Sequence, residues 1–121
     1  MKILSPRAHG YIDYLVVIGF FSGPRVFEFD GIAATIAYGL AAVHLVLTLA
    51  TAFPLGLVRI VPLPLHGILE FFVGVVLLGL PWAASFSGDE RAKLFFLCAG
   101  ACVILAFLLT DYRPDSTTPA A

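Results

Sequence analysis

The chain has 121 residues, which is the length of one domain. Hydrophobic residues make up 60% of it and charged residues 12%, whereas soluble domains carry roughly 25% charged residues. The formal net charge of −1 at pH 7 argues against a nucleic-acid-binding protein, because such proteins present a basic patch. The composition predicts an integral membrane protein whose main partner is the lipid bilayer.

The first predicted helix covers residues 6–21. Ser5 can serve as its N-cap, and Pro6 takes the first helical position, where the missing N–H of proline costs nothing. The sequence Ser22-Gly23-Pro24 predicts the end of this helix, because glycine and proline commonly mark turns.

The second predicted helix covers residues 32–53 and stops at Pro54. No charged residue occurs between Gly31 and Val58. A hydrocarbon core about 30 Å thick needs about 20 apolar residues, so this segment is long enough to cross it.

The second half of the chain follows the same plan. A third helix is predicted from Pro64 to the Pro81-Trp82 turn, and a fourth over residues 91–110. The polar tail, residues 115–121, is predicted to be disordered.

A polar motif occurs twice in the apolar sequence. His9-Gly10-x-x-Asp13 recurs as His66-Gly67-x-x-Glu70, 57 residues later. This predicts an internal duplication, and without any gap the same offset superimposes Tyr14 on Phe71, Pro24 on Pro81, Phe29 on Phe86 and Gly31 on Gly88.

The predicted fold is all-α, a four-transmembrane-helix bundle built from two tandem helical hairpins. Residues 1–114 form a single transmembrane domain, with repeat one at 1–57 and repeat two at 58–114. Such a parallel internal repeat has a pseudo-twofold axis along the membrane normal. An even number of spans places both termini on one side.

The distribution of basic residues gives the expected orientation. The terminal side carries four basic residues and the opposite side three, so the positive-inside rule favours cytoplasmic termini. The four are Lys2, Arg7, Arg59 and Arg113, and the three are Arg25, Arg91 and Lys93.

The repeated motif places polar groups on helix faces. Residues four apart share a face, so His9 projects with Asp13 and His66 with Glu70. His44 lies nine residues before the predicted end of its helix, roughly 13 Å in from the same side and near the depth of the two carboxylates. The sequence therefore predicts that three histidines and two carboxylates cluster in one half of the bundle.

Four roles fit such a cluster. It can be a structural clasp that satisfies buried polar groups. It can bind a divalent metal ion, since histidine and carboxylate suit zinc, iron or manganese, although the Glu-x-x-His spacing of di-iron bundles is missing. It can relay protons or ions in a small translocating subunit that works as a homo-oligomer. Finally, His9 and His66 can ligate haem in an electron-transfer protein, although both lie at the membrane edge.

Features of an enzyme are missing from the sequence. It contains no glycine-rich phosphate loop and no nucleophile elbow, and its serines lie at span ends without an evident triad. We expect no catalytic activity, and the sequence identifies no protein partner.

The motifs resemble one known family. Residues 5–14, the second copy from Pro64 to Glu70 and the turn Leu80-Pro81-Trp82 are similar to the SPW-repeat family of small bacterial integral membrane proteins. The resemblance covers both repeats, and the turn of the first repeat reads Gly23-Pro24-Arg25 instead. It implies four spans and a location in the bacterial inner membrane, and it implies no particular biochemical activity.

Overall fold

The computed structural model describes residues 2–113, so the tail predicted at 115–121 lies outside the described residues. As predicted, the fold is all-helical, apart from one very short parallel sheet. Its elements in chain order are α1 (Pro6–Val26), α2 (Gly31–Leu49), β1 (Thr51–Ala52), β2 (Val61–Pro62), α3 (Leu63–Ala83) and α4 (Glu90–Leu109).

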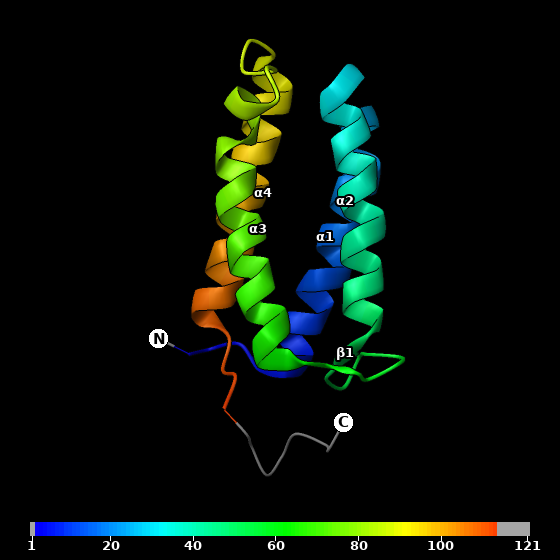
Figure 1. The fold of residues 1–121 in the computed structure, drawn as a ribbon, viewed down its shortest axis with the longest axis vertical. Helices are drawn as coiled ribbons and strands as arrows, with labels where there is room; N and C mark the ends of the chain where they lie inside the picture. The colour runs from blue at the N-terminus through cyan, green and yellow to red at the C-terminus, as the bar shows by residue number, and fades with distance from the viewer. Residues whose placement is uncertain (1, 114–121) are drawn as a thin grey trace.

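The helices form two pairs (Figure 1). α1 packs along α2 and α3 packs along α4, while contacts between the pairs are fewer. The two ends of the described chain meet at one end of the bundle, where Leu4 and Thr110 form a parallel β-bridge. The N–H of Leu4 donates to the carbonyl of Leu109, and the N–H of Asp111 donates to the carbonyl of Leu4, each at 2.9 Å.

Three helices, α2, α3 and α4, are long and apolar enough to cross a membrane. α1 has the length but is not among them, because Arg7, His9 and Asp13 lower the mean hydropathy of its first turns. Large apolar side chains such as Phe21 and Val43 cover the outer surface. This exterior is consistent with contact to a lipid bilayer.

The predicted end of the first helix was wrong, whereas the third helix ends at Ala83, one residue past the predicted Pro81-Trp82 turn. α1 continues through Pro24, and α3 continues through Pro81. Each helix ends where a residue takes a positive φ, at Glu28 (57°) and Ser85 (61°). The N–H of the next residue then bonds back to the proline carbonyl, from Phe29 at 3.0 Å and from Phe86 at 2.8 Å. A left-handed residue followed by this bond terminates a helix, whereas a proline close to the C-terminus removes only one donor.

The second helix ends at Leu49, four residues before the predicted Phe53, and was also wrong in this respect. The following loop folds back and satisfies the last carbonyls of α2. Leu57 and Val58 donate to Leu49 at 2.7 and 2.9 Å, and Val61 donates to Ala50 at 2.8 Å.

The end of the bundle far from Leu4 is packed with aromatic rings. Phe96 of α4 is fully buried, and its ring centroid lies 5.0 Å from Phe86 and 6.3 Å from Phe29. Phe20 of α1 joins them. The interior therefore has an apolar end, and its polar groups lie towards the other.

Candidate functional site

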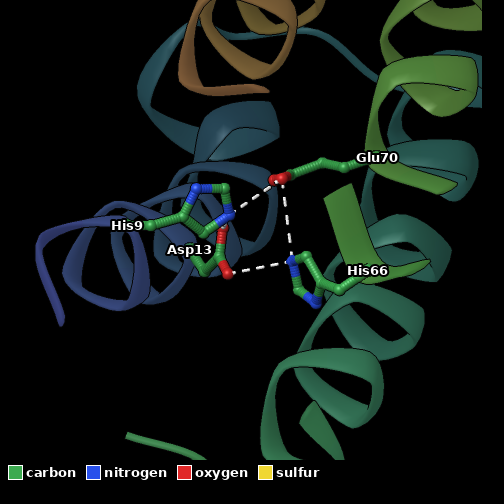
Figure 2. A group of neighbouring side chains, drawn as sticks. All are labelled: His9, Asp13, His66 and Glu70. Atoms are coloured by element: carbon green, nitrogen blue, oxygen red, sulfur yellow. Dashed lines mark ion pairs between the residues drawn. The ribbon is translucent and has the colours of Figure 1, made fainter. Parts of the chain in front are cut away.

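Four polar side chains meet between α1 and α3. His9 and Asp13 come from one face of α1, and His66 and Glu70 from one face of α3; all four are between 0% and 2% exposed. Figure 2 shows the two pairs pointing toward one another across the space between the helices. The i,i+4 spacing explains why each pair shares a face, and the packing of the helices brings the pairs together.

The contacts between the two helices are as short as any in the cluster. His9 Nε2 lies 3.0 Å from Glu70 Oε2, and His66 Nε2 lies 3.0 Å from Asp13 Oδ2. Within one helix the corresponding distances are 3.2 Å from His9 to Asp13 and 3.6 Å from His66 to Glu70.

His44 of α2 completes the group. Its Nε2 is 3.6 Å from Asp13 Oδ1 and 3.7 Å from Glu70 Oε1. Each of the three histidine Nε2 atoms thus lies between one oxygen of Asp13 and one oxygen of Glu70. The structure places together all five residues that the sequence singled out.

Two threonines hold the outer nitrogens of the histidine rings. His9 Nδ1 is 2.6 Å from Thr110 Oγ1, and His66 Nδ1 is 2.7 Å from Thr51 Oγ1. Each hydroxyl gives its single hydrogen to a backbone carbonyl one turn earlier, that of Ala106 or Leu47. Each threonine oxygen must therefore accept from Nδ1–H, which leaves the Nε2 of a neutral ring as an acceptor directed into the cluster.

The inner atoms of the cluster consequently lack hydrogen-bond donors. With neutral rings, lone pairs of His9 and His66 face carboxylate oxygens at 3.0 Å, and buried acceptors need a partner. Positive charge can supply this partner in two ways. Either His9 and His66 each carry a second proton, on Nε2, or a metal ion lies between the histidines and the carboxylates. Within the cluster, the buried atoms without a hydrogen bond are Nε2 of His9, His44 and His66, and both carboxylate oxygens of Asp13 and Glu70.

Two aromatic residues cover the histidines. The ring of Tyr112 lies 6.0 Å from that of His9, and the ring of Phe53 lies 6.3 Å from that of His66. The glycine that follows each histidine makes room for them. A Cβ on Gly67 would lie 2.6 Å from the Tyr112 hydroxyl, and a Cβ on Gly10 would collide with Phe53. Burial raises the pKa of Tyr112, so its phenol stays neutral.

Sequence reasoning missed these four supporting residues as parts of the site. A signal for them does exist, because Thr51-Ala-Phe53 recurs as Thr110-Asp-Tyr112. This second motif repeats after 59 residues rather than 57, so an ungapped comparison hides it.

Comparison with protein families, with curated proteins and with solved structures finds no match to this chain.

Proposed function

We propose that the chain is a four-span integral membrane protein that binds one divalent transition-metal ion between its helices. The observation that carries this proposal is the convergence of three histidine Nε2 atoms and two carboxylates at one buried point. One ligand atom from each of His9, Asp13, His66 and Glu70 can be chosen so that all lie within 4.8 Å of one another.

The distances suit a single ion. Bonds from zinc to nitrogen or oxygen are about 2.1 Å long, so ligands about 90° apart are about 3.0 Å from each other and ligands about 120° apart about 3.6 Å. The six nitrogen–oxygen distances in the cluster run from 3.0 to 3.7 Å. These nitrogen–oxygen distances match those between neighbouring ligands of one ion.

The charge also suits a divalent ion. Asp13 and Glu70 carry two negative charges when ionised, and three neutral imidazoles add none. A divalent cation makes the site neutral overall, which matters because an unpaired charge inside a membrane is expensive. Imidazole and carboxylate ligands favour zinc, iron or manganese. A closed structural zinc site usually has four protein ligands, and the five residues here are enough to supply them.

Membrane insertion of α1 is part of the proposal. The polar His9 and Asp13 are fully buried, whereas Leu15, Ile18 and Phe21 are 66%, 59% and 68% exposed. The face of α1 that would meet lipid is therefore apolar, although the mean hydropathy of the whole helix is lower than that of the other three. Tandem repeats are supported by the matching roles of Thr51 and Thr110. Residence in a bacterial inner membrane with cytoplasmic termini rests on the family resemblance and the basic residues.

Elemental analysis of protein purified in detergent tests the proposal. We expect about one equivalent of zinc, iron or manganese, retained through dialysis. Asp13→Asn should lower metal affinity at least ~100-fold, because it removes a ligand and half of the balancing charge. Glu90→Gln is the matched control, since Glu90 forms an ion pair with Lys93 at the exposed start of α4, away from the cluster. Wild-type protein that holds no metal, even after titration, would refute the proposal.

A metal-free clasp is the second candidate. The two 3.0 Å contacts between α1 and α3 favour it, because protonated His9 and His66 would then form ion pairs with Glu70 and Asp13. It predicts no metal in the purified protein. It also predicts that chelators leave thermal unfolding unchanged, while Asp13→Asn lowers the unfolding temperature.

The two remaining alternatives have less support. A haem ligated by His9 and His66 would place its porphyrin between the two Nε2 atoms. Asp13 and Glu70 occupy that space, because their oxygens lie between 3.0 and 3.6 Å from both Nε2 atoms. A proton or ion relay predicts flux in liposomes that is lost when Asp13→Asn and Glu70→Gln are combined.

A further inference from the structure

His44 differs from the other two histidines of the cluster in how firmly its ring is held. Its Nε2 lies 3.6 and 3.7 Å from the carboxylates, and no contact between a nitrogen and an oxygen of the cluster is longer. No residue in the range 2–113 forms a hydrogen bond with its Nδ1, whereas threonines fix His9 and His66. No hydrogen bond therefore fixes the outer edge of the His44 ring.

His44 is also the member of the cluster nearest the outer surface. Its side chain is 9% exposed, against 0% to 1% for the other four. It projects from α2, and α2 packs only lightly against α3. In Figure 1, α2 and α3 face each other along the length of the bundle. A ligand in this place can contact the site with Nε2 and the exterior with the opposite edge of its ring.

The other half of the bundle has no counterpart to His44. His44 precedes Thr51 by seven residues, and the residue seven before Thr110 is Val103. Val103 is 1% exposed and apolar. A reciprocal clasp of two histidines and two carboxylates would not require this third histidine, so His44 calls for a separate explanation.

We propose that His44 is the exchangeable ligand of the metal site, through which the ion enters and leaves between α2 and α3. This inference rests on the proposed metal-binding function. An ion that approaches from this side meets His44 Nε2 first and is then passed to the two carboxylates and to the two histidines that the threonines hold. His44 lies five residues before the end of α2 at Leu49, so an ion that comes from that end of the bundle reaches it without crossing the apolar middle of the membrane.

Metal exchange kinetics test this role. Co²⁺ would be bound to the purified protein, because its visible spectrum reports coordination geometry. The rates of Co²⁺ uptake and of removal by a chelator would be measured by stopped flow for wild type, His44→Val and His44→Asn. Val43→Ala, one residue earlier on α2 at a 67% exposed position, is the matched control.

We expect both His44 variants to take up Co²⁺ at least 10-fold more slowly than wild type and the control. A residue that acts only as a fifth ligand would instead leave uptake unchanged and speed release, because lost contacts mainly affect dissociation rates. That result would overturn the exchange role and leave the metal site standing. A wild-type protein that binds no Co²⁺, Zn²⁺ or Mn²⁺ would overturn both. If His44→Val does not fold, His44→Asn decides.

Discussion

The hydroxyl oxygen of Thr110 accepts a hydrogen bond from Nδ1 of His9, 2.6 Å away, although 101 residues separate them in sequence. Thr51 makes the same contact with His66 at 2.7 Å. Each bond crosses from one helix pair to the other. The two threonines thereby fix which nitrogen of each histidine faces the cluster, as supporting partners of metal-bound histidines commonly do.

Thr110→Val should weaken metal binding about 10- to 100-fold, because it keeps the side-chain shape but removes the acceptor for His9. Competition against a chromophoric zinc chelator would measure the change. Thr35→Val is the matched control, since Thr35 makes the same bond to a carbonyl one turn earlier on the exposed side of α2. Equal losses in the two variants would show that the effect is not specific to the cluster.

Metal affinity should fall as pH is lowered from about 7 to 5, where unperturbed histidine gains its proton. Metal affinity falls because a metal ion binds the lone pair of a neutral Nε2, and at lower pH a proton competes for the same lone pair. Titration calorimetry in buffers of different ionisation enthalpy would show proton release on binding. An affinity that stays constant over this range would exclude histidine ligands.

Gly67→Ala should destabilise the protein by about 1–3 kcal/mol, because the new methyl group overlaps Tyr112 and forces its ring from its place beside His9. Gly79→Ala in the same helix is the control, since nothing lies within 4 Å of its Cβ position. Alanine there should be neutral or stabilising by up to ~1 kcal/mol. Thermal unfolding in detergent compares them, and equal unfolding temperatures would contradict the packing described.

Glu28→Gln should change stability by less than ~1 kcal/mol, although Glu28 forms an ion pair with Arg91 that links the two helix pairs. Both side chains are well exposed, at 73% and 62%, so water and salt screen their attraction. The same unfolding assay applies, with Lys93→Gln as the comparison. A loss of several kcal/mol would mean that this end of the bundle depends on its surface charge.

Helix positions followed from the sequence more reliably than helix ends. Apolar runs bounded by charged or turn-forming residues located all four helices. The third and fourth helices end within one residue of the prediction, whereas the ends of the first and second were wrong because Pro24 and Pro54 do not mark them. Pro24 lies inside α1, and the stop comes from the left-handed backbone at Glu28, a conformation that its residue type does not announce.

The sequence by itself determined which polar residues share a helix face, because the 3.6-residue period fixes the relation of His9 to Asp13 and of His66 to Glu70. Only the tertiary structure decided that the pairs meet at 3.0 Å, and that Thr51 and Thr110 direct both Nε2 atoms inward. The period of a helix determines only the relative directions of side chains on that same helix. Distances between helices depend on how their side chains and loops pack, and that information is spread over the whole chain.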